Sequence, residues 1–269
     1  MNRNIVKLFM DRYGMDISIF NESFVNKTIL QRINLTGCLD IEDYIHYITE
    51  NEKEAALFIG LLQVSYSEFF RNPLSFSVLE NIVLPELVSS KRNNKSKEIR
   101  IWSAACAGGH ETYSLAIILE KLIGQNDKMS YRIFGTDQDE KQISKARLGE
   151  YNKESVGNLT QKQLEQWFVR SGNSYSVIPE LKKSIKFSVF DLLSKHGCPP
   201  ESIYGDFDLV MCANILFYYK PVYQKRIMDK ISDSLAEDGL LITGEAEREI
   251  LKASKFKEIY PQSGIFRKK

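Results

Sequence analysis

Beyond residue 98, short apolar runs typical of β-strands alternate with segments of helical periodicity, and no other feature constrains the fold as much. A helix is predicted over residues 115–122, where apolar residues recur on one face, and another is predicted from Pro221 to Asp238-Gly239. The predicted strands are 98–103, 131–136, 184–189, 207–212 and 240–244. Strands that alternate with helices predict βαβ units and a mainly parallel sheet, so the expected class is α/β.

The first seventy residues, by contrast, carry only helical periodicity. Apolar residues recur at helical spacing around residues 5–9 and again over residues 41–48, and Asp40 can cap the second segment. The polar segment 89–98 is predicted to be an exposed loop. We therefore expect an all-α N-terminal domain over residues 1–72 and an α/β domain over residues 73–269.

Charge and cysteine content narrow the class of protein. The 36 basic residues balance 35 acidic ones, which argues against a nucleic-acid partner. The four cysteines and three histidines show no metal-ligand spacing, so we expect no metal site and reduced thiols. The first residues do not resemble a signal peptide, and no run approaches the roughly 20 apolar residues of a membrane span. A cytoplasmic protein without membrane insertion is expected.

Three clusters follow predicted strands and indicate a ligand site. Residues 104–111 combine small residues with two glycines, Asp137 ends the next strand, and Asn214 follows a later one. Ligands of open α/β sheets bind beyond the carboxyl ends of the strands, where a carboxylate often accepts hydrogen bonds from ribose. The order of the three clusters along the chain, a loop, then an acid, then an amide, favours a nucleoside ligand. Taken singly, the glycines can be explained by a tight turn and the acid by a helix cap. The glycine pattern is not that of a nicotinamide site, and Asp139 is expected to cap a helix.

Several motifs recur in a characteristic order. They are Ser67-Glu-Phe-Phe-Arg71, Ile101-Trp-Ser-Ala-Ala105, Glu111-Thr-Tyr-Ser114, Gly135-Thr-Asp-Gln-Asp139 and Cys212-Ala-Asn-Ile-Leu-Phe-Tyr218. From about residue 60 to residue 250 the chain thereby resembles the CheR family of chemotaxis receptor methyltransferases. The resemblance implies an N-terminal helical domain joined to a class I (Rossmann-like) S-adenosylmethionine-dependent methyltransferase domain. It also implies a small inserted β-subdomain, which we expect at about residues 172–184.

The resemblance assigns site residues. It implies that the cofactor contacts Ser65, Ser67, Arg71, Glu111, Asp137, Asp191, Leu192, Asn214 and Ile215. Glu111 would meet the amino-acid end of S-adenosylmethionine and Asp137 its ribose, whereas Asp191 and Leu192 would lie near the adenine. The family usually has asparagine in place of Asp191.

Arg71 and Tyr218 are the residues expected to be catalytic. The implied reaction esterifies glutamate side chains of a chemoreceptor and leaves S-adenosylhomocysteine. Because the glutamate is already ionised at neutral pH, no general base is required, and catalysis rests on positioning. The planar guanidinium group of Arg71 matches the geometry of a carboxylate. Tyr218 can donate a hydrogen bond to the incoming glutamate or pack against the methyl group. An ion pair for Arg71 and a core role for Tyr218 are the structural alternatives.

The chain departs from the family pattern at a few positions. His110 and Thr112 stand where the family usually has glutamate and proline, Ala213 replaces an arginine, and Glu245 makes the region more acidic. Substrate preference is therefore open. One alternative is a weakly active or inactive module that binds S-adenosylmethionine or S-adenosylhomocysteine and signals through protein contacts, and another is methylation of a small carboxylate. The protein partner is expected to be the helical cytoplasmic domain of a chemoreceptor, bound by a monomer.

Overall fold

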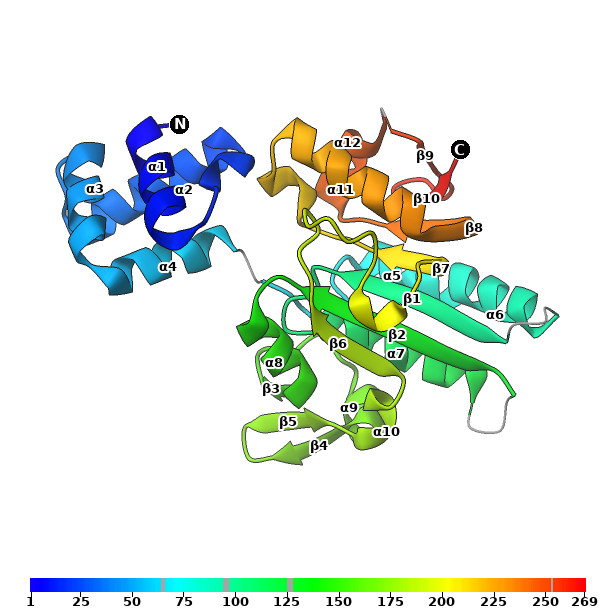
Figure 1. Ribbon diagram of the computed structural model, residues 1–269. Helices are drawn as coiled ribbons and strands as arrows, with labels where there is room; N and C mark the ends of the chain where they lie inside the picture. Colours follow the sequence, from blue (N-terminus) through cyan, green and yellow to red (C-terminus); the bar gives the residue numbers. More distant parts are fainter. Residues whose placement is uncertain (64–65, 94–96, 125–127, 253) are drawn as a thin grey trace. The chain divides into compact units, whose positions relative to one another are not determined.

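The computed structural model describes residues 1–63, 66–93, 97–124, 128–252 and 254–269, and two compact units make up the chain (Figure 1). The first unit contains Met1–Val64 together with Leu216–Lys225. The second contains Ser65–Ile215 and Arg226–Lys269. The expected boundary at residue 72 thus lies inside the second unit, and the ten-residue return segment, Leu216–Lys225, packs with the first.

Four α-helices lie wholly within the described part of the first unit, in keeping with its helical periodicity. They are α1 (Arg3–Tyr13), α2 (Glu22–Thr36), α3 (Ile41–Glu50) and α4 (Glu52–Leu62). Asp40 caps α3 as predicted, since its side chain accepts a hydrogen bond from the Asp43 N–H at 2.9 Å. Asp43 in turn accepts the Leu39 N–H at 2.8 Å, so the two side chains together satisfy donors at the start of the helix.

The return segment is held to this unit by aromatic contacts. The ring of Tyr219 stacks on Phe20 with centroids 5.3 Å apart, and Tyr218, in the short 3₁₀ turn η4 (Leu216–Tyr218), lies 4.7 Å from Phe24. The backbone N–H of Asn21 also donates to the Tyr218 carbonyl at 2.7 Å. These contacts bury Phe20 and Tyr219 almost completely.

A buried ion pair ties three helices of the first unit together. Arg32 on α2 donates to both carboxylate oxygens of Glu54 on α4, at 2.8 and 2.7 Å, and the Tyr44 hydroxyl on α3 donates to Glu54 at 2.8 Å. The Arg32 bonds hold the pKa of Glu54 below its usual range. Lys27 on the same helix is exposed.

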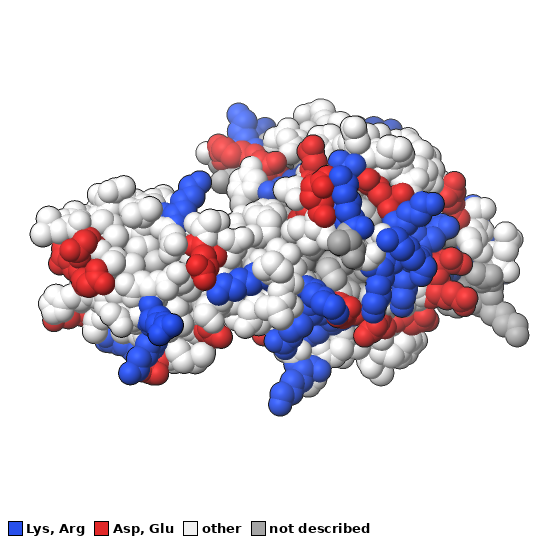
Figure 2. All heavy atoms as spheres, turned by 90° about the horizontal axis from the view of Figure 1, so that it is seen from above, with Lys and Arg blue, Asp and Glu red and all other residues white. Residues whose placement is uncertain are grey.

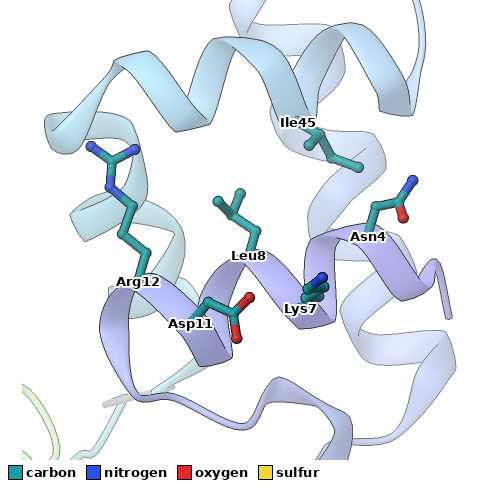
Figure 3. Close-up of a pocket in the computed structure, with 6 residues that line it drawn as sticks. All are labelled: Asn4, Lys7, Leu8, Asp11, Arg12 and Ile45. Carbon is teal, nitrogen blue, oxygen red and sulfur yellow. The ribbon is translucent and has the colours of Figure 1, made fainter.

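An open groove on this unit lies between α1 and α3 (Figure 3). Its lining mixes charged, polar and aliphatic side chains: Asn4, Lys7, Leu8, Asp11, Arg12 and Ile45. Basic and acidic side chains also lie beside one another over the face drawn in Figure 2, in keeping with the balanced composition.

The second unit is centred on a seven-stranded sheet, and it confirms the predicted α/β class. In spatial order the strands are β6 (Ile185–Val189), β2 (Ser130–Asp137), β1 (Glu98–Ala104), β7 (Phe207–Met211), β8 (Leu235–Ile242), β10 (Ile265–Lys268) and β9 (Phe256–Glu258). The strands from β6 to β8 are parallel, whereas β10 pairs antiparallel with both of its neighbours. The order reverses between β1 and β7, so the sheet is doubly wound with its switch point between these two strands.

Helices cover the sheet on both faces. They include α5 (Pro73–Val78), a π-helical turn (Leu79–Val83), α6 (Leu84–Arg92), α7 (His110–Ile123), α8 (Glu140–Leu148), α11 (Pro221–Ser234) and α12 (Arg248–Lys252). Alternate residues of β1 face opposite ways: Ile99 and Ile101 join the core formed with α5, α6 and α7, whereas Trp102 packs on Phe190 and Phe207.

Two boundaries differ from the prediction. The helix that begins at Pro221, as expected, ends at Ser234 and not at Asp238-Gly239. The reason is a bulge: Leu235 already pairs with Phe207, and the register shifts before Leu240 pairs with Leu209. Helix α6 extends to Arg92, so the first part of the predicted 89–98 loop is helical; residues 94–96 lie outside the described ranges.

A separate three-stranded antiparallel sheet lies in the region where a small β-subdomain is expected. Its order is β3 (Glu150–Asn152), β5 (Ser174–Val177) and β4 (Phe168–Ser171), with α9 (Gln161–Trp167) and α10 (Pro179–Lys182) at its ends. It thus begins before the expected range of 172–184, part of which is helical. No helix among the described residues has the length and apolarity that a bilayer crossing needs.

Candidate functional site

The loop between β1 and α7 approaches its surroundings so closely that it requires small residues. Ala105, Ala107 and Gly109 all have positive φ angles (52°, 45° and 84°). A Cβ on Gly109 would lie 2.9 Å from the Cβ of Ala146. The Cys106 N–H donates to the Thr136 carbonyl at 2.8 Å, which fixes the loop against the end of β2. The small-residue run 104–109 therefore leaves backbone, with little side-chain bulk, at the carboxyl ends of the central strands.

Asp137 holds this loop from the end of β2. Its Oδ2 accepts the Ala107 N–H at 2.9 Å and its Oδ1 accepts the Asp139 N–H at 3.0 Å. Burial raises the pKa of the Asp137 carboxyl. Asp139 caps α8 through the Lys141 N–H at 2.8 Å, as predicted, so the two neighbouring acids have separate roles.

Glu111, in the first turn of α7, is a buried acid that forms no salt bridge with the described residues. Its side chain is 6% exposed, and its Oε1 has no hydrogen-bond partner among the described residues. Burial raises the pKa of Glu111 to about 7. The charge of Arg71 opposes this rise, and the charge of Glu247 adds a smaller increase. An unpaired buried acceptor of this kind is costly and suits a cationic ligand group.

Two departures from the family pattern have structural explanations beside Glu111. The Thr112 hydroxyl is fully buried and donates to the Ser103 hydroxyl at 2.8 Å, which links α7 to β1. The His110 ring packs 4.6 Å from Tyr151 and 5.1 Å from Phe69. Burial lowers the pKa of His110 to about 4, so the ring is neutral at pH 7 and acts in packing at the start of α7.

Asn214 and Ile215 lie where the chain leaves β7. Asn214 has a positive φ of 62°, and its side-chain oxygen is 3.5 Å from the Asn72 amide nitrogen. The N–H groups of both residues donate to the carboxylate of Glu247, at 2.8 and 2.6 Å. Glu247 was not among the predicted site residues. Its place in the stretch Gly244-Glu-Ala-Glu247 does not by itself indicate a buried carboxylate.

The segment that carries Ser67 and Arg71 belongs to the second unit. Arg71 donates to the Tyr66 carbonyl at 3.0 Å, and its guanidinium lies 5.1 Å from the centre of the Tyr66 ring. The Ser67 hydroxyl is buried and has no partner among the described residues. Phe70 adopts a positive φ of 51° while its N–H donates to the Ser114 hydroxyl of α7 at 2.9 Å. Ser65 lies outside the described residues.

The remaining predicted residues occupy different surroundings. Asp191, after β6, is exposed, and its Oδ1 accepts the Leu193 N–H at 2.8 Å, so its carboxylate shapes its own turn. Leu192 is buried beside it. Tyr218 belongs to the first unit, where it contacts Phe24 and lies 4.2 Å from the Phe217 ring. The structure thus gathers Glu111, Asp137, Asn214 and Ile215 at the carboxyl ends of β1, β2 and β7, and it places Tyr218 in the other unit.

Comparison with known proteins identifies the kind of site. Residues 65–264 match the family described as CheR methyltransferase, SAM binding domain. The chain is 30% identical over 235 residues to a chemotaxis protein methyltransferase of Listeria innocua, covering 87% of this chain and 85% of the relative. It is 29% identical over 251 residues to the chemotaxis protein methyltransferase of Escherichia coli, covering 91% and 83%.

Solved structures give a more distant likeness. A S-adenosylmethionine-dependent methyltransferase from Clostridium acetobutylicum aligns with a TM-score of 0.35 at 15% identity, over 71% of this chain and 56% of that one. The family match covers most of the second unit and includes every residue gathered at the strand ends. On that match and the relatives' identity, the chain belongs to the CheR family of chemotaxis methyltransferases, with S-adenosylmethionine as its cofactor.

Proposed function

We propose that this protein is a cytoplasmic enzyme that esterifies glutamate side chains in the signalling region of a chemoreceptor. The observation that carries the proposal is that two acids follow neighbouring strands: Glu111, whose buried Oε1 has no hydrogen-bond partner among the described residues, and Asp137, which is anchored by the Ala107 N–H. The first suits the ammonium and the second the ribose of S-adenosylmethionine. The relatives named as chemotaxis methyltransferases support a receptor as the substrate.

The residues of this chain have modest chemical tasks in such a reaction. S-adenosylmethionine, when bound, supplies a methyl group already activated by its sulfonium. Glu111 would bind the ammonium, Asp137 the ribose, and the Asn214–Ile215 turn would flank the methyl group. Arg71 would orient carboxylates through its planar fork. Because the accepting glutamate is ionised at neutral pH, the reaction needs no general base. His110 is therefore not assigned that role, and its ring is packed among aromatic rings.

The test is transfer of a radiolabelled methyl group from S-adenosylmethionine to a purified chemoreceptor signalling fragment. A glutamyl methyl ester releases its label as methanol in mild alkali, whereas N-methyl groups do not. We expect alkali-labile label on the parent fragment and none on a fragment whose glutamates are replaced by glutamine. Ligand binding without transfer would favour the signalling-module alternative suggested by Ala213 and Glu245. Label on small carboxylates alone would favour the small-molecule alternative.

A further inference from the structure

One buried side chain joins the ends of two central strands. Glu247, in the 3₁₀ turn after β8 (Glu245–Glu247), has no exposed surface. Its Oε2 accepts the N–H groups of Gly244 and Asn214, each at 2.8 Å, and its Oε1 accepts the Ile215 N–H at 2.6 Å. A single carboxylate thereby accepts three backbone donors, one from the end of β8 and two from the turn after β7.

This arrangement is specific to a carboxylate. Both oxygens of an ionised carboxyl group are acceptors only, and each can take two hydrogen bonds. A glutamine of the same shape would place an NH₂ group against either the Ile215 N–H or the N–H groups of Asn214 and Gly244. A buried N–H that loses its acceptor has given up its bond to water without a replacement, which is unfavourable.

Gly244 fixes the same turn from its other side. A Cβ added at Gly244 would lie 2.4 Å from the Asn214 side-chain nitrogen and 3.1 Å from the Asn214 backbone nitrogen. The Asn214 backbone has a positive φ of 62°, a left-handed conformation that asparagine adopts more readily than most residues but that its surroundings must still hold in place. Close contact with Gly244 and the bonds to Glu247 together provide that constraint.

We propose that Glu247 is the positioning residue of the methyl-transfer site, which holds Asn214 and Ile215 in their binding conformation. Glu247 acts through these two residues. This assignment rests on the proposed function, since it takes the turn after β7 to contact the cofactor. It also explains why Glu247 is buried and accepts three backbone hydrogen bonds, whereas Glu245 in the same turn is exposed.

Calorimetric titration of S-adenosylhomocysteine into four proteins tests the assignment: the parent, Glu247→Gln, Asn214→Ala and the double variant. We expect Glu247→Gln to weaken binding about tenfold in the parent and less than about twofold in the Asn214→Ala background, because residues that act through one another are non-additive. Glu249→Gln is the matched control. Its side chain is exposed and pairs with Lys252, so binding should not change.

Hydrogen exchange provides a readout that needs no ligand. In the ligand-free protein, Glu247→Gln should speed amide exchange in peptides covering 212–216 and 243–247 and leave the strands β1 and β2 unchanged. If that variant unfolds, Gly244→Ala disturbs Asn214 from the opposite side and should weaken binding to a similar extent. Full affinity in Glu247→Gln, or additive losses in the double variant, would overturn the assignment while leaving the proposed function intact. A parent protein that binds no S-adenosylhomocysteine would overturn both.

Discussion

The backbone N–H of Ala107 donates to the carboxylate of Asp137 at 2.9 Å, so the acid at the end of β2 holds the loop that follows β1. One Asp137 oxygen holds this loop and the other accepts the Asp139 N–H. Each carboxylate oxygen can accept a second hydrogen bond, which leaves capacity for ribose hydroxyls. Asp137 therefore has both a structural task and a proposed binding task, and the two can be separated by substitution.

Replacement of Asp137 by alanine should abolish or strongly weaken cofactor binding. The variant loses both the loop bond and the proposed ribose acceptor, so we expect the Kd for S-adenosylhomocysteine to rise at least about tenfold, equivalent to about 1.4 kcal/mol. Isothermal titration calorimetry measures the change. Asp139→Ala removes only the cap of α8 and should cost about 1 kcal/mol of stability without altering the Kd. Equal effects of the two substitutions on the Kd would refute the binding role.

Binding of S-adenosylhomocysteine should weaken as pH falls below about 7. Burial raises the pKa of Glu111 to about 7, so below that value the carboxyl group of the free protein is protonated and must lose a proton to pair with an ammonium. We expect affinity to fall by up to about tenfold per pH unit between pH 7 and pH 5. Titrations in buffers of different ionisation enthalpy should show proton release. In Glu111→Gln the affinity should be low and show no such pH dependence.

The same residue should make the ligand-free protein less stable at and above neutral pH than in mild acid. The pKa of Glu111 is about 7 in the folded protein, against its usual value of 4.5. Protonated Glu111 therefore contributes to the free energy of unfolding, and this contribution is complete below pH 4.5 and is lost as pH rises to 7. The loss amounts to about 3 kcal/mol. Glu111→Gln should therefore unfold at higher denaturant concentration than the parent at pH 8, and the difference should shrink toward pH 5. An unchanged difference between these pH values would contradict the shift.

Arg71→Lys should lower methyl transfer more than it lowers cofactor affinity. Lysine keeps the charge that acts on Glu111 but lacks the planar fork that can orient a carboxylate. We expect kcat to fall about 10- to 100-fold. Steady-state kinetics gives kcat, and calorimetry gives the cofactor affinity. Arg132→Lys is the control, because Arg132 pairs with Glu98 at the opposite ends of β1 and β2 and should leave both unchanged. A loss confined to affinity would limit Arg71 to cofactor binding.

Glu54→Gln should destabilise the first unit. Arg32 and Tyr44 both donate to the Glu54 carboxylate, and removal of its charge leaves a largely buried guanidinium without its partner. The expected loss is about 3 kcal/mol at pH 7. Since the pKa of Glu54 is lowered in the folded protein, its stabilisation is present at neutral pH and is lost in acid. The exposed pair Lys121–Glu80 is the comparison, and Glu80→Gln should cost less than about 1 kcal/mol.

The central fold could be predicted because its signals are local. Strands such as 98–103 and 207–212 are apolar runs flanked by turns, and α3 is capped by Asp40 as its sequence indicates. The acids at the strand ends could be found for the same reason, since position after a strand is visible in the sequence. Periodicity did not locate the end of α11, because a bulge between β7 and β8 recruits Leu235 into the sheet.

The remaining features depend on contacts between distant segments. Glu247 bonds to Asn214 and Ile215, more than thirty residues earlier, and nothing near it in sequence indicates that its carboxylate is buried. Arg32 looks like an exposed cation on a helix until its pairing with Glu54 is known. Tyr218 follows the family motif closely, yet its contacts with Phe24 place it in the helical unit. Contacts between residues far apart in the sequence are therefore what the sequence alone could not reveal.

The return segment, Leu216–Lys225, has a consequence for dissecting the protein into fragments. Because this segment contributes Tyr219 to the core around Phe20, the helical unit cannot be obtained intact as a single continuous stretch of chain. A single cut in the backbone just before residue 66 would leave the return segment, which is part of the helical core, on the larger fragment. The smaller fragment would then expose the ring of Phe20. A single cut therefore divides the aromatic core of the helical unit between the two pieces.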